Sequence, residues 1–281
     1  MNNQYTTHIY PKTKLLNLEL VEIWRYRDLL LMFVKRDLIT VYKQTILGPM
    51  WFLLQPVLTT AMYMLVFGNI AKISTDGMPQ ILFYLSGVVL WGYFSDCFTK
   101  ISNTFTQNAG IFGKVYFPRL IVPFSELASG FVKFLIQFYL FAVIYIYYLR
   151  SGNTAIQPNW TLYLVPVYVA MVAAMGLASG LIFSSLTTKY RDLKHLLVFG
   201  VQLLMYATPV IYPVSTIPEK YQHYILANPL TPIFEGFKYA FLGSGHFSWD
   251  ELAYSGAVTA VLLFFGVIIF HQTERNFIDT V

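Results

Sequence analysis

The sequence predicts an all-α membrane protein that crosses the bilayer six times, and composition is the first observation behind this prediction. Of the 281 residues, 56% are hydrophobic and 12% are charged, which is about half the charged fraction of a soluble domain. The second observation is length, because six apolar runs approach the roughly 20 residues that a helix needs to cross a bilayer. The third is the distribution of cations between these runs, which favours one side of the membrane.

The first 48 residues form a polar N-terminal segment. Within it Leu16, Leu20, Ile23 and Trp24 recur at helical spacing among charged residues, a pattern typical of an amphipathic helix. We expect this helix, over residues 15–40, to lie at the membrane–water interface. Simple anchoring and docking of a partner are equally compatible with the pattern.

A single transmembrane domain is expected over residues 49–275, followed by a tail over residues 271–281. Its six predicted spans cover residues 50–70, 81–98, 120–149, 162–186, 195–214 and 252–270. The fourth span contains Gly176 and Gly180 in a G-x-x-x-G pattern. Such a pattern allows helices to approach closely, either within one subunit or between two.

Residues 215–250 are too polar to span the membrane and too apolar for an ordinary loop. Ile233, Phe237 and Phe241 recur every four residues, while Glu235 and Lys238 occupy the other faces. The pattern predicts short amphipathic helices that form a re-entrant hairpin between the fifth and sixth spans. A hairpin of this kind requires protein or water around its ends.

Lysine and arginine are distributed unequally between the two sides of the predicted spans. Fourteen lie in the N-terminal segment, the loops 99–119 and 187–194 and the tail, whereas four lie on the opposite side. The positive-inside rule therefore places both termini in the cytoplasm. Because this placement accounts for most of the net charge of +5, we expect no nucleic acid among the partners.

The sequence contains no motif for catalysis or nucleotide binding. G-x-x-x-x-G-K-[ST] and H-E-x-x-H are absent, the five histidines are scattered, and Cys97 is the one cysteine. We therefore expect no enzyme activity, no metal site and no cofactor bound by this chain.

Three ionisable residues, Asp96, Glu126 and Lys133, fall inside or at the ends of predicted spans. Asp96 and Glu126 lie near cytoplasmic helix ends and can reach the interface, whereas Lys133 is deeper. Lys133 is seven residues from Glu126 and on the same helical face. An ion pair, within one helix or between two, is therefore favoured over a proton path.

Aromatic residues make up 18% of the chain, and interfacial belts explain many of them. An aromatic ring joins an apolar face to a polar edge, which suits a path for a sugar chain. Six positions exceed the need for anchoring and are candidates to line such a path: Trp51, Tyr63, Tyr84, Trp91, Tyr93 and Tyr206.

The predicted cytoplasmic loop 99–119 combines cations with apolar side chains. The apolar residues are Ile111, Phe112, Val115, Tyr116 and Phe117. On a solvated loop such residues are typical of an interaction surface. Pro118 favours a helix end at Phe117, and Arg119 is expected among headgroups or near Asp96 and Glu126. We expect an interaction surface here rather than a plain turn.

Several stretches resemble ABC-2 type permeases that export polysaccharides, and they occur in the same order. They are Arg36-Asp37, Tyr42 to Trp51 with Gln55-Pro56, Lys114 to Glu126, Lys189 to Asp192, Met205 to Tyr212 and Asn228 to Pro232. The likeness covers residues 30 to about 245. It is strongest to permeases of O-antigen and related lipopolysaccharide exporters, and capsule and teichoic-acid permeases are near relatives.

This resemblance implies an ABC-2 (type V exporter-like) fold, a homodimer and two copies of a separate ABC ATPase. ATP and Mg²⁺ would be held by this ATPase partner. It implies export of an O-antigen-like polysaccharide, linked to undecaprenyl pyrophosphate, across the inner (cytoplasmic) membrane of a bacterium. It also implies that the ATPase stroke is received by the interface helix and the cytosolic loop. The corresponding residues here are Arg36, Asp37, Phe112, Lys114, Tyr116 and Arg119.

Three other functions are alternatives. An ABC-2 exporter of teichoic acid, capsule or another lipid or drug would share the fold. A membrane-embedded sugar or acyl transferase would need a carboxylate or histidine cluster at one membrane face, which the sequence does not suggest. A secondary transporter would need two repeated halves with broken helices, and no such repeat is evident.

Overall fold

The computed structural model describes residues 20–43, 45–152, 156–190, 192–243 and 245–277, and these residues form helices and connecting turns with no strand. The predicted all-α class is confirmed. Residues 1–19 and 278–281, which belong to the expected N-terminal segment and tail, lie outside the described residues, as does Arg191.

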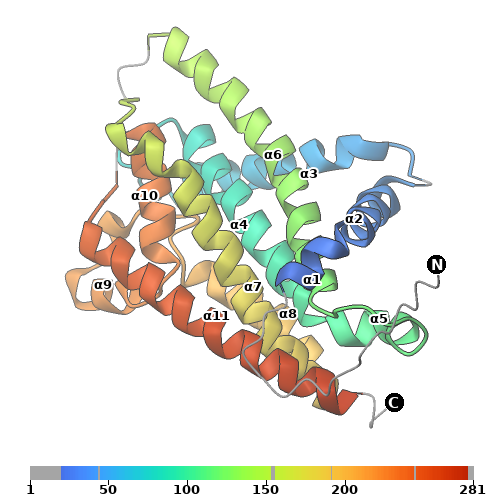
Figure 1. Ribbon diagram of the computed structural model, residues 1–281. Coiled ribbons are helices and arrows are strands. Elements are labelled where there is room, and N and C mark those ends of the chain that lie inside the picture. Colours follow the sequence, from blue (N-terminus) through green and yellow to red (C-terminus); the bar gives the residue numbers. More distant parts are fainter. Residues whose placement is uncertain (1–19, 44, 153–155, 191, 244, 278–281) are drawn as a thin grey trace, which may run out of the picture.

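The chain is organised as a bundle of long helices with shorter helices at both ends (Figure 1). The α-helices are α1 (Leu20–Arg25), α2 (Arg27–Tyr42), α3 (Trp51–Tyr63), α4 (Gln80–Ser102), α5 (Thr104–Phe112), α6 (Ile121–Arg150), α7 (Val165–Lys189), α8 (Leu193–Tyr206), α9 (Glu219–Leu226), α10 (Thr231–Leu242) and α11 (Trp249–Phe277). Short 3-10 turns precede α3 (Gly48–Met50), α7 (Trp160–Leu164) and α9 (Val214–Thr216), and a π-helical segment (Met64–Ile70) continues α3.

Five helical segments of the described residues are long and apolar enough to cross a membrane. They are Gly48–Ile70, Gln80–Ser102, Ile121–Arg150, Trp160–Lys189 and Trp249–Arg275, and they correspond to the first four and the last of the predicted spans. The predicted fifth span, 195–214, is replaced by the 14-residue helix α8, which begins at Leu193 and ends at Tyr206. At 1.5 Å per residue α8 is about 21 Å long, which is shorter than the roughly 30 Å hydrocarbon core of a bilayer.

Helix α8 ends early because the chain turns at Thr208-Pro209, and a residue before proline disfavours the α conformation. Side chains satisfy the carbonyl groups that this turn leaves free. Tyr212 Oη donates to the Tyr206 carbonyl (2.7 Å), Asn228 Nδ2 donates to that of Ala207 (3.0 Å), and Lys238 Nζ donates to that of Pro209. Protein groups thus stabilise the non-helical backbone, as a membrane setting requires.

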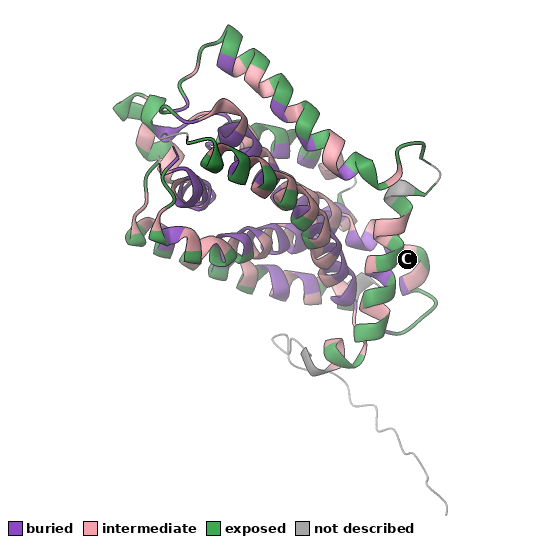
Figure 2. Ribbon diagram, turned by 90° about the horizontal axis from the view of Figure 1, so that it is seen from above, coloured by how far each residue is buried: buried purple, intermediate pink, exposed green. Residues whose placement is uncertain are grey.

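Helix α4 lies at the centre of the bundle and packs against α3, α6 and α7, while α7 also packs against α11. Buried residues follow these inner helices and exposed residues follow the outer ones (Figure 2). A Cβ atom at Gly180 would lie 2.6 Å from Ile101 Cβ, and one at Gly176 would lie 3.0 Å from Cys97 Cβ. The G-x-x-x-G pattern therefore serves packing of α7 on α4 within one chain.

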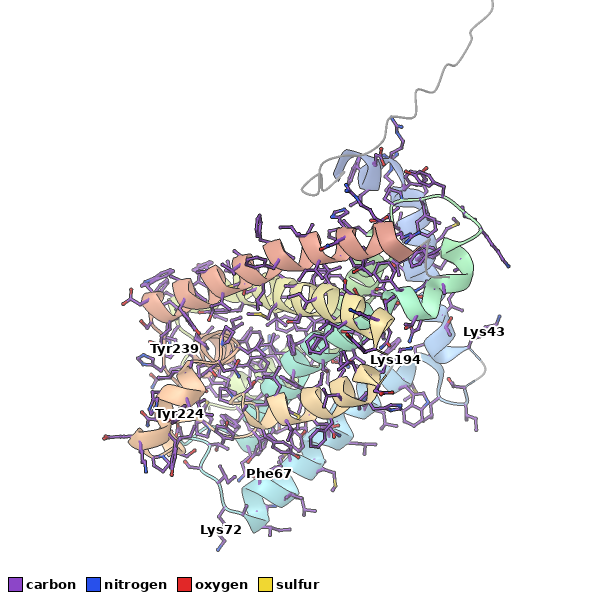
Figure 3. All side chains as sticks on the ribbon, turned by 90° about the horizontal axis from the view of Figure 1, so that it is seen from below. Lys43, Phe67, Lys72, Lys194, Tyr224 and Tyr239 are labelled. Carbon is purple, nitrogen blue, oxygen red and sulfur yellow. The ribbon has the colours of Figure 1, made fainter. Side chains whose placement is uncertain are left out.

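The two ends of the bundle carry different elements. Helices α9 and α10 lie at one end, whereas α1, α2, α5 and the C-terminal end of α11 lie at the other (Figure 1). Lys43 and Lys194 are at the second end, and Lys72 and Tyr224 are at the first (Figure 3). The loops richest in cations thus gather at one end.

Helix α10 differs from the amphipathic helix that the sequence predicts. The sequence places Glu235 and Lys238 on the faces opposite the apolar stripe, but both residues are buried, with exposed fractions of 3% and 2%. The reason is that α10 is covered on several sides by α4, α7, α11 and the turn Trp160–Leu164. The Lys238 ammonium lies 3.9 Å from the centre of the Phe83 ring.

Candidate functional site

A polar groove opens between α3, α4, α6 and α8, within the apolar part of the bundle. It has a volume of about 150 Å³ and is lined by Gln55, Pro56, Thr59, Tyr63, Val88, Trp91, Gly92, Ser95, Gln137, Met205 and Val210. Its amide, hydroxyl and aromatic side chains offer both hydrogen-bonding groups and flat apolar surfaces. Two of the six aromatic residues predicted to line a path, Tyr63 and Trp91, border this groove.

The groove contains a proline whose missing hydrogen bond is replaced from another helix. Pro56 lies inside α3 and cannot donate to the carbonyl of Phe52, four residues earlier. Gln137 Nε2 of α6 donates to that carbonyl at 3.3 Å. The pair fixes the position of α3 relative to α6 and places the Gln137 amide at the wall of the groove.

The other four candidate path residues occupy different environments. Trp51 and Tyr206 are 42% and 56% exposed, whereas Tyr84 and Tyr93 are buried within the chain. Tyr63 Oη, at the groove, lies 3.3 Å from Met205 Sδ. A role for any of these residues in lining a path stays a prediction.

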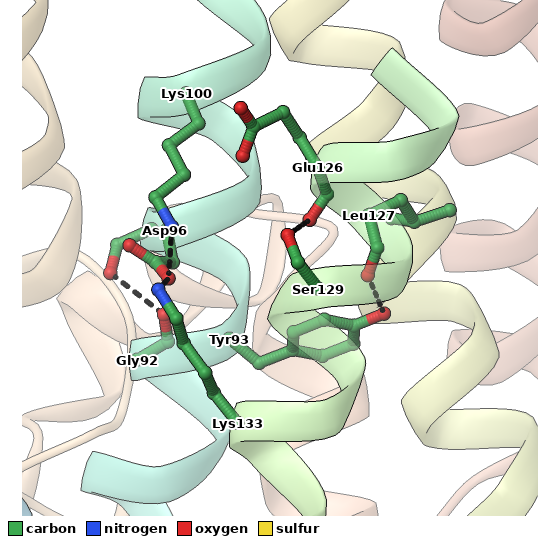
Figure 4. A network of polar contacts seen from close by, with 9 residues as sticks. Gly92, Tyr93, Asp96, Lys100, Glu126, Leu127, Ser129 and Lys133 are labelled. Atoms are coloured by element: carbon green, nitrogen blue, oxygen red, sulfur yellow. Dashed lines mark hydrogen bonds and ion pairs between the residues drawn. The ribbon is translucent and has the colours of Figure 1, made fainter. Parts of the chain in front are cut away.

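A cluster of charges joins α4 to α6 near the groove (Figure 4). Lys133 Nζ and Lys100 Nζ both lie close to Asp96 Oδ2, at 3.0 and 3.1 Å. Lys133 is therefore neutralised between helices, by Asp96 rather than by Glu126. Lys100 was not singled out in the sequence, although its spacing of four residues from Asp96 is a recognisable helix-pair signal.

Glu126 lies beside this cluster (Figure 4) but makes no ion pair with either lysine among the described residues. Its side chain is buried, and its Oε2 has no hydrogen-bond partner among the described residues. Helices α2 and α6 pack together, and Arg36 and Asp37 of α2 are close enough to Glu126 to interact with its charge. Within α2, Arg36 Nη2 pairs with Asp37 Oδ1 at 2.8 Å, and the Arg36 guanidinium lies 4.7 Å from the centre of the Phe33 ring.

The predicted coupling loop contains a packed aromatic cluster rather than a fully exposed apolar surface. Neighbouring ring centres lie 4.7 to 6.0 Å apart, and the members are Phe33, Phe105, Phe112, Phe117 and Phe270. Phe112 and Phe117 are 8% and 5% exposed, so the expectation that they are exposed is wrong. Helix α5 ends at Phe112 and not at Phe117, and the following loop turns back onto α2.

Exposed side chains of this loop form a second group. Val115 and Tyr116 are 59% and 78% exposed, and Lys114 is also exposed. Trp24 on α1 and Leu31 and Met32 on α2 are more than 60% exposed. The apolar members of this group are part of the apolar surface that the described chain offers at this end of the bundle.

Arg119 connects the loop to the last helix. Its Nη1 donates to the Glu274 carbonyl at 2.9 Å, and its guanidinium lies 5.4 Å from the centre of the Phe112 ring. Burial lowers the pKa of Arg119, and the nearby Glu274 carboxylate opposes this effect. The expected placement near Asp96 and Glu126 is therefore wrong, because the side chain turns toward α11.

The described residues contain no group of three or more His, Cys, Asp or Glu side chains placed to hold a metal ion. The groove and the predicted coupling loop are suited to non-covalent contacts. The groove offers hydrogen bonds and aromatic faces to a solute, and the loop joins α2, α5 and α11 through shared packing.

Comparison with known proteins gives one family and several similar chains. The family described as ABC-2 type transporter matches residues 28–242. The O-antigen export system permease protein RfbA of Myxococcus xanthus is 27% identical over 92% of this chain and 98% of its own length. RfbA of Klebsiella pneumoniae is 26% identical over 90% and 94%, and the polysialic acid transport protein KpsM of Escherichia coli is 22% identical over 85% and 91%.

The family match covers the region from α2 to α10. It therefore contains the groove, the charge cluster and the predicted coupling loop 99–119. It confirms the resemblance that the sequence motifs indicate. The chain belongs to the ABC-2 type transporter family.

Proposed function

We propose that this chain is the membrane permease subunit of a bacterial ATP-driven polysaccharide exporter. The observation that carries this proposal is the family match over residues 28–242, together with similarity over nine-tenths of the chain to proteins named O-antigen export permeases. ATP hydrolysis belongs to a separate ABC ATPase, of which two copies act on the permease.

The substrate in this proposal is an O-antigen-like polysaccharide linked to undecaprenyl pyrophosphate. The groove between α3, α4, α6 and α8 supports a glycan, because its amides and hydroxyls pair with sugar hydroxyls and its aromatic rings cover apolar sugar faces. A different substrate is the second candidate. The Escherichia coli inner membrane transport permease YadH, whose name specifies no polysaccharide, is 23% identical over 68% of this chain.

The functional unit in this proposal is a homodimer in the inner membrane with cytoplasmic termini. In a single chain the most apolar part of Gly48–Ile70 is only 17% buried, so a second copy would cover this helix and close the groove. Helix α8 and the turn after it would complete a sixth crossing, and α9 and α10 would form the re-entrant hairpin on the outer side.

Genetic complementation tests the proposed function. Cells that lack their own permease should regain surface polysaccharide when this chain is produced with its ATPase, as measured by gel analysis of the surface glycan. The matched control is an ATPase whose nucleotide-binding lysine is replaced, and it should restore no export. Full export without any ATPase partner would contradict the proposal.

Cysteine labelling tests the proposed topology. In a Cys97→Ala background, Glu219→Cys on α9 and Asp250→Cys at the start of α11 should react with an impermeant thiol reagent from outside. Lys114→Cys should react only after the membrane is opened. Gly243 is unsuitable for this purpose, because a Cβ there would lie 2.5 Å from the Gln157 carbonyl oxygen. Labelling of Lys114→Cys in intact cells would contradict the topology.

A further inference from the structure

One wall of the groove is formed by the end of α8 and the turn that follows it. Met205, near the end of that helix, and Val210, within the turn, both line the groove. The Val210 N–H donates to the Thr208 carbonyl at 2.6 Å, so the turn is tight. A Cβ at Gly87 would lie 2.6 Å from the Val210 carbonyl oxygen. The missing side chain at Gly87 therefore lets this wall lie directly on α4.

Lys238 of α10 reaches the same turn from outside the groove. Its Nζ donates to the carbonyl of Pro209, the residue before Val210. Its ammonium also lies 3.9 Å from the centre of the Phe83 ring, and Phe83 is about one helical turn before Gly87 on α4. One buried side chain thus joins α10, the turn and α4, although Lys238 is not among the residues that line the groove.

Lysine is an unfavourable residue at this position if packing alone is considered. Burial lowers the pKa of Lys238, whereas the nearby Glu235 and Asp76 carboxylates raise it. Replacing a buried pair of charges by well-packed neutral side chains is often neutral or stabilising. The ammonium is therefore not needed to fill space. What it supplies is a strong, directed hydrogen bond to one carbonyl group.

We propose that Lys238 is a positioning residue for the groove, because its hydrogen bond to the Pro209 carbonyl sets the position of the turn that forms the groove wall. This inference rests on the proposed function, since it gives a role in transport to a side chain that does not touch the substrate. Without this bond, the side-chain hydrogen bonds to the Tyr206 and Ala207 carbonyls still hold the α8 side of the turn. The Val210 side is then released from α4, and the groove widens.

Thiol labelling of the complete transporter, purified with its ATPase, tests this role. In a Cys97→Ala background, Val88→Cys places a reporter in the groove, and Ser151→Cys places a matched thiol at an exposed position after α6. Lys238→Met combined with Glu235→Gln removes the donor without leaving an unpaired buried carboxylate. This double variant should raise the labelling rate of Val88→Cys by methyl methanethiosulfonate about tenfold, the shift expected when a hydrogen bond from a charged group is lost. Labelling of Ser151→Cys should stay unchanged.

Glu235→Gln alone is the matched control. It removes the neighbouring buried charge but keeps the hydrogen bond from Lys238 to Pro209, so Val88→Cys should be labelled as in the unaltered chain. Lys238→Gln with Glu235→Gln is a second variant, whose shorter polar side chain does not reach the same carbonyl, and it should label as fast as the methionine variant. Thermal unfolding separates positioning from a general loss of stability, because both double variants should unfold close to the temperature of the control.

Export by the same variants connects the groove wall to transport. At equal amounts of assembled transporter, Lys238→Met with Glu235→Gln should deliver surface polysaccharide several-fold more slowly than Glu235→Gln alone. Equal labelling of Val88→Cys with and without Lys238 would overturn the positioning role. Faster labelling in Glu235→Gln alone would also overturn it, and so would a joint rise at Val88→Cys and Ser151→Cys with a lower unfolding temperature.

The positioning role and the proposed function fail in different ways. If the chain restores polysaccharide export in the complementation experiment but labelling of Val88→Cys does not depend on Lys238, the positioning role is wrong and the proposed function stands. If the chain with its ATPase exports no polysaccharide, the proposed function itself is wrong, even where labelling in the groove responds to Lys238.

Discussion

The first two membrane-spanning segments have similar composition and opposite environments. Gly48–Ile70 and Gln80–Ser102 each contain 23 residues and are apolar enough to cross a bilayer. In the most apolar part of the first, 17% of residues are buried within the chain, and in that of the second, 72% are buried. Apolar composition therefore determines that a segment enters the membrane, but it does not determine which segment forms the core.

Small residues and polar contacts account for the difference. Helix α4 packs closely against glycines of its neighbours. A Cβ added at Gly130, Gly176 or Gly180 would lie 3.2, 3.0 or 2.6 Å from the nearest α4 atom. Helix α3 instead contains Pro56 and relies on a side-chain hydrogen bond from Gln137. One helix is held by close packing and the other by a polar contact beside a groove.

The largest expected effect is on packing of the core helix. Gly180→Leu should prevent correct assembly, because even a Cβ at this position would lie 2.6 Å from Ile101 Cβ and close helix packing depends on the small residue. The measurement is the yield of monodisperse protein after detergent extraction and size-exclusion chromatography. The control is Gly256→Ala on α11, where a Cβ would approach only Met171 Cε at 3.9 Å, and it should leave the yield unchanged.

The next largest effect on stability is expected in the predicted coupling loop 99–119. Phe112→Ala should destabilise the protein by about 3–5 kcal/mol, the usual cost of removing a buried phenylalanine, as measured by thermal unfolding. Tyr116→Ala, at a side chain 78% exposed, should change stability by less than about 0.5 kcal/mol but weaken association with the ATPase. Unchanged ATPase association in Tyr116→Ala would remove the exposed part of the loop from the coupling surface.

The sequence predicts those features that depend on neighbouring residues. Apolar runs predict five of the long helices, and the Asp96–Lys100 spacing carries a pair signal that could have been used. The short α8 could also have been expected, because Thr208-Pro209 interrupts the apolar run. The burial of Phe112, Glu235 and Lys238 could not be predicted, because it depends on helices far away in the chain.

The charged cluster shows the same limit. Lys133 lies seven residues from Glu126 on the same helical face, and the sequence leaves open an ion pair within this helix or one with another helix. The observed partner is Asp96, 37 residues away, and this choice depends on the register between α4 and α6. Gly130 allows that register, because a Cβ there would lie 3.2 Å from Cys97 Sγ. A single sequence does not reveal the register between α4 and α6, because that register depends on how the two helices pack.

A moderate effect is expected where α3 depends on its polar contact. Gln137→Leu should destabilise the protein by about 1–3 kcal/mol, because the Phe52 carbonyl would lose its donor. Pro56→Ala restores a backbone N–H for that carbonyl, so it should rescue most of the loss in the double variant. Thermal unfolding of both single variants and the double variant gives the coupling energy directly. Additive effects in the double variant would show that the two residues act separately.

The smallest effect on stability is expected on the exposed side of α3, where a path for the glycan would leave its mark on transport instead. Trp51 and Val57 are both 42% exposed, so Trp51→Leu and Val57→Leu are a matched pair. Each should alter stability by less than about 0.5 kcal/mol. If Trp51 lines the path, Trp51→Leu should lower the rate of polysaccharide export several-fold, because leucine keeps apolar surface but lacks the flat ring on which a sugar can lie; single aromatic contacts contribute about 0.5–1.5 kcal/mol. Export is measured as the appearance of surface glycan after induction, with the dimer quantified in the same membranes. Equal export by both variants would place Trp51 among the residues that only face lipid or the second copy.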